Sequence, residues 1–332
     1  MNSMAQPAAP WPRCRPGYAV AGSIALLLGI TFGRLAEDSL LWRELQNTGH
    51  TLLFGVLALL VLCSYRAYAK RCTRRGVADY LVAGVVCLTC GIAVELIQEV
   101  TGRDADAIDV LRDLAGILSA LGLSAAFDPG LRARGQPLQR ASRRLALLVP
   151  VGCLAIASIS PFCVLAWAYQ QRAHAFPVLA DPAARWSAPF LALSHASLDR
   201  PGDSMACAAN GKAGLARLRL EPVRYAGFSI IEPQPDWRGH TQLLLELYSI
   251  QPEPLELSIR IDDARHNQEQ TDRYNRRLAL APGENTIHIP LSEVLHAPAE
   301  RRMDMAHIAG VTLYITDTSR PVVFCMGPLR LE

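Results

Sequence analysis

The residues best suited to chemistry in this chain are grouped in one polar stretch, 95–116, between two long apolar runs, 80–94 and 117–127. Its charged and amide side chains are Glu95, Gln98, Glu99, Arg103, Asp104, Asp106, Asp109, Arg112 and Asp113. Ionisable groups at the ends of bilayer-length apolar segments are costly to dehydrate. They therefore pair with one another, face the interior of a helix bundle or serve a function.

Acid–base chemistry is what this set of residues could support. Glu95 and Gln98 are three residues apart, and Asp109 and Asp113 are four apart, so each pair occupies one face of a helix. His50 begins another apolar run. An imidazole and carboxylates gathered in a partly dehydrated pocket can exchange protons. The candidate catalytic residues are His50, Glu95 and Asp109, and the candidate ligand-binding residues here are Gln98, Arg103 and Asp113.

A structural role is the alternative for the same side chains. Polar groups at helix ends reach toward lipid headgroups, and Arg103 paired with Asp106 or Asp109 would simply hold the turn. We favour the structural role for Asp106 and leave both roles open for Glu95 and Gln98.

Five apolar segments of about 20 residues are long enough to cross a bilayer and would position these side chains. They are 18–36, 50–68, 79–99, 107–127 and 145–169. Hydrophobic residues make up 51% of the 332 residues, which is high for a soluble protein. The net charge of +3 is too small to predict nucleic-acid binding.

Basic residues are concentrated before the first apolar segment and in the loops 66–75 and 132–144. The positive-inside rule then predicts a cytoplasmic N-terminus and an external location for everything after the fifth segment. This topology would bring the polar side chains at these span ends to the same outer leaflet, namely His50, Glu95, Gln98, Asp109 and Asp113. Because the chain has no P-loop, haem, zinc or nucleophile motif, we expect no cofactor and no metal.

The predicted domains are a disordered cytoplasmic tail (1–17), a five-span membrane domain (18–169), a Pro/Ala-rich linker (170–185) and an external domain (186–332). The external domain contains short alternating segments bounded by turn residues, which predict an antiparallel β-sandwich, most simply a jelly roll. Cys207 and Cys325 are its only cysteines. The sequence leaves open whether they form a disulfide.

A spaced set of residues in 40–127 adds a family resemblance. These residues are His50, Phe54, Glu95, Gln98, Arg103, Asp109, Asp113 and Gly116. Their pattern resembles the VanZ-like family of bacterial membrane proteins, named for a glycopeptide (teicoplanin) resistance protein. Members usually have Asn at the position of Asp113, so this chain has an extra charge that needs a partner. The resemblance implies an envelope protein that acts near peptidoglycan or surface polysaccharide.

The external domain resembles galactose-binding and carbohydrate-binding jelly rolls, through Trp237-x-Gly239, the strand 255–263 and the loop that follows it. Sugar sites combine an aromatic platform with fixed polar groups. The candidate ligand-binding residues in this domain are His266, Asp272, Arg273 and Tyr274. The structural alternative is an ion pair between Asp272 and Arg273 that braces the loop.

Together these observations predict a multi-pass protein of the bacterial cytoplasmic (inner) membrane with a periplasmic sandwich. We expect a binding or accessory function on a lipid-linked saccharide, a peptidoglycan fragment, an envelope polysaccharide or a glycopeptide, with membrane lipid as the other partner. One alternative is an intramembrane acid–base enzyme in which Glu95 is the base, His50 its partner and Arg103 the anion holder. Another is a membrane anchor that displays the sandwich.

Overall fold

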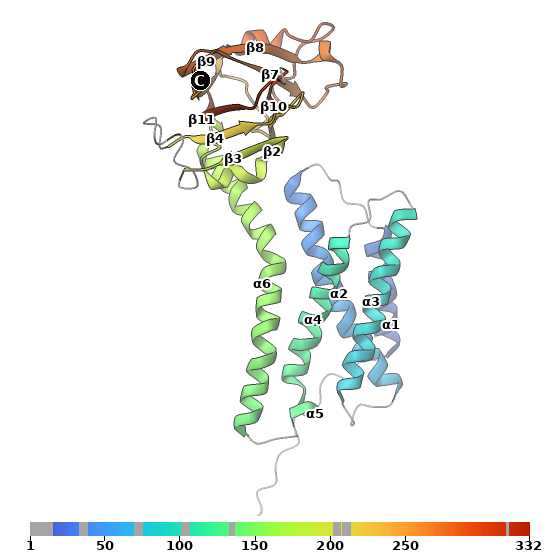
Figure 1. Ribbon diagram of the computed structural model, residues 1–332. Coiled ribbons are helices and arrows are strands. Elements are labelled where there is room, and N and C mark those ends of the chain that lie inside the picture. The colour runs from blue at the N-terminus through green and yellow to red at the C-terminus, as the bar shows by residue number, and fades with distance from the viewer. Residues whose placement is uncertain are drawn as a thin grey trace, which may run out of the picture. The chain divides into compact units, whose positions relative to one another are not determined.

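The computed structural model describes residues 16–32, 39–69, 76–100, 107–132, 137–201, 207, 214–316 and 319–332. The chain forms two compact units, Met1–Val164 and Leu165–Glu332. The first is helical and the second is built of strands, as Figure 1 shows. The expected order of an apolar helical part followed by an antiparallel β-sandwich is therefore confirmed.

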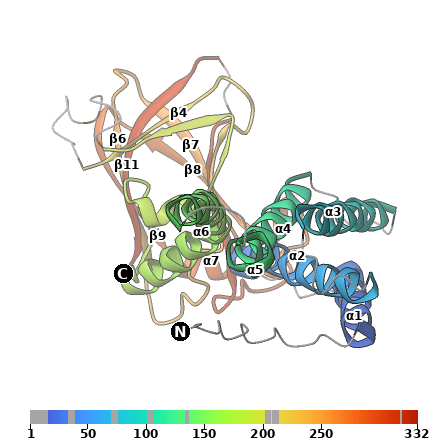
Figure 2. The ribbon, with the colours of Figure 1, turned by 90° about the horizontal axis from the view of Figure 1, so that it is seen from below.

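The first unit is built from apolar helices that pack side by side. The helices are α1 (Pro16–Phe32), α2 (Leu40–Tyr68), α3 (Val77–Val100), α4 (Ala107–Phe127), α5 (Pro129–Arg132) and α6 (Pro137–Ala175), the last of which continues into the second unit. Helix α2 packs against α1, α3 and α4, and it lies between α1 and α4 in the view of Figure 2.

Four helical segments are long and apolar enough to cross a membrane, namely Leu40–Tyr68, Val77–Val100, Ile108–Phe127 and Ala141–Ala175. Helix α1 has 17 residues. At 1.5 Å per residue it is about 26 Å long, slightly less than a bilayer core of about 30 Å. A count of five spans therefore stays a prediction.

Helix α2 begins ten residues earlier than the apolar run that starts at His50. Residues 40–68 form one continuous helix of 29 residues. Its start is fixed by Ser39, whose Oγ accepts a hydrogen bond from the N–H of Trp42 at 3.3 Å. His50 consequently lies almost three turns inside the helix rather than at its start.

Helices α2 and α4 approach each other at glycine. A Cβ atom on Gly116 would come within 1.9 Å of the carbonyl oxygen of Thr51, and one on Gly55 within 3.2 Å of the carbonyl oxygen of Gly116. Any side chain at Gly116 would therefore force the two backbones apart. This contact places the segment around His50 directly beside the first turns of α4.

The second unit consists of eleven described strands in two antiparallel sheets. The strands are β1 (Val178–Ala180), β2 (Leu191–Ser194), β3 (Ala196–Asp199), β4 (Ala216–Leu220), β5 (Gly227–Ile231), β6 (Gln242–Ser249), β7 (Leu255–Asp263), β8 (Tyr274–Leu280), β9 (Gly283–Pro290), β10 (Ile308–Tyr314) and β11 (Val322–Leu331). One sheet has the order β3-β4-β11-β6-β9, with β1 also paired to β11, and the other has the order β2-β5-β10-β7-β8.

Alternating apolar residues of both sheets form one core, which includes the fully buried Trp237. The indole N–H of Trp237 donates to the carbonyl oxygen of Gln234 at 2.8 Å. The short helices η1 (Arg185–Phe190), η3 (Gln270–Asp272) and α7 (Leu291–Leu295) lie between strands. The short alternating segments expected in the external domain are present as strands, among them β4 to β11.

The segment expected to be a linker, 170–185, contains ordered structure that belongs to the second unit. Strand β1 pairs with β11 at Val178 and Arg330. The guanidinium group of Arg172, in the last turn of α6, lies 4.5 Å from the ring centres of both Tyr169 and Phe190. Only three residues form β1, which is too few for the alternating pattern of a strand to be visible in the sequence.

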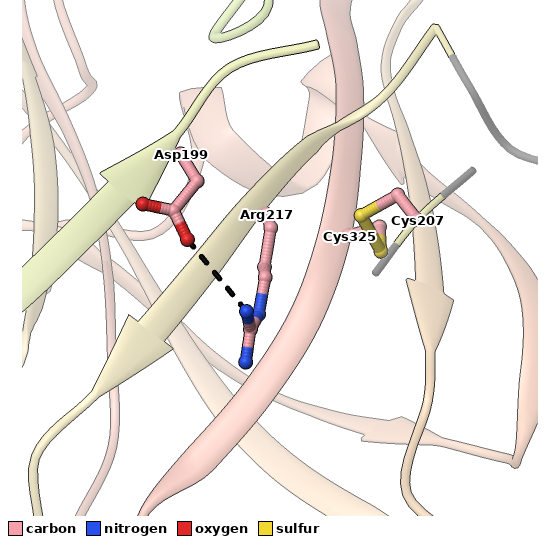
Figure 3. The surroundings of a disulfide bond; sticks show 4 residues. All are labelled: Asp199, Cys207, Arg217 and Cys325. Carbon is pink, nitrogen blue, oxygen red and sulfur yellow. Dashed lines mark ion pairs between the residues drawn. A yellow bond between two sulfur atoms is a disulfide. The ribbon is translucent and has the colours of Figure 1, made fainter. Parts of the chain in front are cut away.

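A disulfide joins Cys207 to Cys325 across 118 positions of the chain. Figure 3 shows it beside the pair Asp199–Arg217, whose charged atoms lie 3.7 Å apart. Arg217 is the register partner of Asp199 on β3 and of Cys325 on β11. The disulfide therefore ties the segment between β3 and β4 to the middle of the six-stranded sheet.

Candidate functional site

Three helices of the first unit bring His50, Glu95 and Asp113 together. His50 comes from α2, Glu95 from α3 and Asp113 from α4. The Nδ1 atom of His50 lies 3.4 Å from Oδ1 of Asp113. One nitrogen of His50 and one carboxylate oxygen from each acid all lie within 4.8 Å of one another. We call these three residues the His–Glu–Asp cluster.

The His–Glu–Asp cluster is buried. The exposed fraction is 0% for Asp113 and 7% for Glu95, and 16% for the side chain of His50. Within the described part of the chain, neither oxygen of Asp113 receives a hydrogen bond. At 3.4 Å the contact between His50 and Asp113 is electrostatic rather than a short hydrogen bond. Asp113 is therefore a dehydrated carboxylate that lies beside the imidazole of His50.

Glycine on α3 makes room for Asp113. A Cβ atom on Gly91 would lie 2.9 Å from Oδ2 of Asp113 and 3.3 Å from the ring of Phe54. Gly91, Glu95 and Gln98 belong to one buried face of α3, which repeats every three to four residues. The expectation that Glu95 and Gln98 share a face agrees with this burial. The need for Gly91 could not be read from the sequence, because it arises from the approach of α4.

An apolar groove adjoins the His–Glu–Asp cluster. The groove has a volume of about 550 Å³ and is lined by residues of α2, α4 and the N-terminal part of α6. Thr51 and Gly116 lie on its wall, and these residues are one position after His50 and three after Asp113. The hydroxyl of Thr51 is buried and has no hydrogen-bond partner among the described residues. None of the three cluster residues lines the groove, so the cluster and the groove share helices α2 and α4 but are separate features.

The remaining residues expected at this site are placed differently. Asp109 lies at the first turn of α4 and accepts a hydrogen bond from Arg112 at 2.5 Å, so its recorded ion pair is with its own helix. Gln98 is 4% exposed, one turn beyond Glu95. Arg103 and Asp106 lie outside the described residues.

A second buried polar group joins α2, α3 and the end of α4. Arg66 donates to Asp79 at 3.2 Å and to Asp128 at 3.0 Å, and the hydroxyl of Tyr80 donates to Asp128 at 2.8 Å. Sequence reasoning treated Arg66 only as a topology signal. Asp128 directly precedes Pro129 and Gly130, and its Oδ1 accepts the N–H of Gly130 at 2.8 Å. These bonds stabilise the helix bundle and hold the turn into α5.

In the second unit, Arg301 organises the loop that contains the predicted sugar-binding residues. Arg301 donates to both oxygens of Asp263 at 2.5 and 2.8 Å, and to both oxygens of Asp272 at 2.5 and 3.0 Å. The expected pair of Asp272 with Arg273 is wrong, because Arg273 donates instead to Asn275 at 3.1 Å. Arg301 is 29 positions from Asp272, too far for a local pattern to reveal.

The pKa values of these carboxylates reflect their bonding. Hydrogen bonds from Arg301 and from the N–H of Asn267 bring the pKa of Asp272 down to about 2. Burial raises the pKa of Asp263, but the bonds from Arg301 and from the N–H of Asp304 outweigh it and leave the pKa below its ordinary value. Both acids are therefore ionised at neutral pH and neutralised by one guanidinium.

The other two predicted sugar-binding residues are buried beside this loop. The side chain of His266 is 3% exposed, and its Nδ1 lies 3.1 Å from the carbonyl oxygen of Asp272. Tyr274 is 5% exposed, belongs to the core, and donates its hydroxyl to Glu293 at 3.2 Å. An aromatic platform for a sugar ring would have to come from another side chain, because the ring of Tyr274 is covered.

Comparison with protein-family models gives no match for this chain, and comparison with curated proteins gives none either. Solved structures that resemble part of it include the agarase AgWH50C, with 14% identity, a TM-score of 0.36, and coverage of 47% of this chain and 26% of the agarase. The match thus spans about a quarter of the agarase.

A second similar structure is a family 11 carbohydrate-binding module from Clostridium thermocellum in complex with a mixed-linked tetrasaccharide, with 13% identity, a TM-score of 0.32, and coverage of 42% of this chain and 82% of the module. Both TM-scores lie below 0.5.

Proposed function

We propose that this chain is a multi-pass protein of the bacterial cytoplasmic membrane that binds a lipid-linked saccharide or a related envelope amphiphile. The observation that carries the proposal is the buried His–Glu–Asp cluster on helices of which two, α2 and α4, also line an apolar groove. An amphiphile has the matching chemistry, with a polar group for the cluster and a hydrocarbon chain for the groove.

The setting of the cluster supports a functional role. Dehydrating two carboxylates within a few ångströms of each other is costly, and for bundle stability alone apolar side chains would serve as well. Apolar residues also cover the outer surfaces of the helices, with Leu81, Ile92 and Ile156 among the exposed ones. A bilayer is the solvent in which such surfaces are stable.

Retention of lipid by the purified chain tests the proposal. The intact protein in mild detergent, measured by native mass spectrometry, should carry an envelope lipid that Glu95→Ala loses. Glu99→Ala is the matched control, because Glu99 lies on the same helix one turn later and is exposed. Equal lipid retention by the parent and Glu95→Ala, or a parent without lipid, would contradict the proposal and favour the membrane-anchor alternative.

An intramembrane acid–base enzyme is the second candidate, and the contact between His50 and Asp113 favours it. A carboxylate beside one ring nitrogen can orient an imidazole so that the other nitrogen exchanges protons with a ligand. Glu95→Gln separates the two functions, because it keeps the size and hydrogen-bonding capacity of the side chain but cannot exchange a proton. Turnover of the retained lipid should stop in this variant, whereas binding would survive.

The sandwich would supply the saccharide-binding half of this function. A fragment used to test it must begin before Val178, because β1 pairs with β11, and a fragment starting at 186 lacks that strand. Absence of affinity for peptidoglycan fragments and envelope polysaccharides would remove this half of the proposal and leave the membrane site intact.

A further inference from the structure

The His–Glu–Asp cluster contains a carboxylate, Asp113, for which the described residues supply little positive charge. Asp113 is fully buried, and neither of its oxygens receives a hydrogen bond within the described part of the chain. Arg112, its neighbour in sequence, is paired with Asp109 at 2.5 Å. A buried carboxylate is stable only when it is paired, protonated or bound to a metal. The cluster thus has the charge and the donor atoms of a cation site.

We infer that His50, Glu95 and Asp113 bind one divalent transition-metal cation, for which Zn²⁺ is the reference ion. The inference rests on the proposed function, because it names the group that would receive the anionic oxygen of the ligand. An imidazole nitrogen with two carboxylate oxygens is a donor set suited to Zn²⁺ and its neighbours in the first transition series.

The spacing of the donors supports this assignment. Zinc binds imidazole nitrogen at about 2.0–2.1 Å and carboxylate oxygen at about 2.0–2.2 Å, so two ligands at a tetrahedral angle lie about 3.4 Å apart. The observed distance from Nδ1 of His50 to Oδ1 of Asp113 is 3.4 Å. One donor atom from each of the three residues lies within 4.8 Å of the other two.

The backbone leaves space for the carboxylate. Because Gly91 has no side chain, Oδ2 of Asp113 occupies a position that lies 2.9 Å from where a Cβ atom would be. Three protein ligands also leave a fourth coordination position on a tetrahedral ion, as in sites where zinc contacts substrate or water. An anionic oxygen of the ligand, such as a phosphate oxygen, fits that position by charge.

Cobalt binding by the intact chain is the sharpest test. The detergent-solubilised protein is stripped with a chelator, titrated with Co²⁺ or Zn²⁺, and desalted. We expect about one equivalent of metal by mass spectrometry, and visible absorption bands from Co²⁺ with an intensity typical of four-coordinate cobalt. This measurement on the parent needs no variant to fold.

Matched variants then locate the ion. Asp113→Asn should weaken metal affinity at least tenfold, whereas Glu99→Gln, at an exposed position one turn after Glu95 on α3, should leave it unchanged. The inference is overturned if the parent retains less than a stoichiometric amount of metal, or if the two variants bind it equally. Lipid retention is measured on the same protein before stripping and again after metal has been restored. Lipid without metal would refute the metal site alone, and metal without lipid would refute the proposed function alone.

Discussion

Replacing Arg301 by methionine should destabilise the sandwich by about 3 kcal/mol. Removing one partner of a buried ion pair costs about 3–5 kcal/mol, because the other charge stays dehydrated and unpaired. The side chain of Asp263 is fully buried, but Arg301 keeps 25% of its side chain exposed. Asp263 also retains the N–H groups of Arg265 and Asp304 at 3.2 and 2.7 Å. We therefore take the lower end of the range.

Calorimetry on the detergent-solubilised chain measures this loss. For a unit of about 150–250 residues, 1 kcal/mol shifts the melting temperature by about 2–4 °C, so Arg301→Met should lower the transition of the sandwich by about 6–12 °C. The sandwich transition is identified as the one that a thiol reductant lowers, because the disulfide lies in this unit.

An exposed ion pair in the same unit is the control. Arg238 and Asp236 lie 2.7 Å apart, but their side chains are 68% and 48% exposed. Arg238→Met should change stability by less than about 0.5 kcal/mol, because exposed pairs contribute little. If Arg301→Met lowers the melting temperature no more than Arg238→Met does, the claim that Arg301 organises this loop is wrong.

Three further predictions follow from the same contacts. The pKa of Asp272 is about 2 in the folded state, below its ordinary 3.8, so its stabilising contribution is full above about pH 4 and is lost as the pH falls toward 2. Calorimetry from pH 5 to pH 2 should show this loss of stability in the parent and a smaller loss in Arg301→Met. An equal fall of the melting temperature with pH in the two proteins would contradict this contribution of Asp272. Gly116→Ala should lower the melting temperature of the helical unit, because the new Cβ would lie 1.9 Å from the backbone oxygen of Thr51. Gly152→Ala is the control and should be neutral or stabilising, because its Cβ would meet nothing within 4 Å. Peptide mapping without reductant should recover Cys207 and Cys325 as one linked pair, and alkylation of both thiols before reduction would show that the bond is absent.

The sequence was sufficient to predict the helices and most of the strands, because both follow from apolar periodicity. Segments of about 20 apolar residues have few other structures available to them, and alternation over five to ten residues defines β4 to β11. The early start of α2 was missed, since its first turns carry the charged residues Arg43 and Glu44 and do not belong to the apolar run that begins at His50. The capping by Ser39 shows why the helix continues through this region.

The gathering of His50, Glu95 and Asp113 was expected from topology, because alternating spans return to the same end of the bundle. The distances between these three side chains could not be predicted, because they depend on how closely the helices pack. Gly91 and Gly116 set that closeness, and a glycine in an apolar helix looks the same in sequence whether or not a neighbour touches it. The role of Arg301 could not be predicted either, because its partners Asp272 and Asp263 lie 29 and 38 positions away in the sequence.

The position of β11 has a consequence for biosynthesis. It is the last strand in chain order, yet it lies between β4 and β6 inside the six-stranded sheet and also pairs with β1. Until 322–331 have been made and delivered, β4 and β6 expose facing edges with no strand between them, and Cys207 has no Cys325 to pair with. Unpaired strand edges promote aggregation in incomplete chains. The six-stranded sheet can therefore close only after 322–331 are available, and a chaperone that shields open strand edges would be most needed before that point.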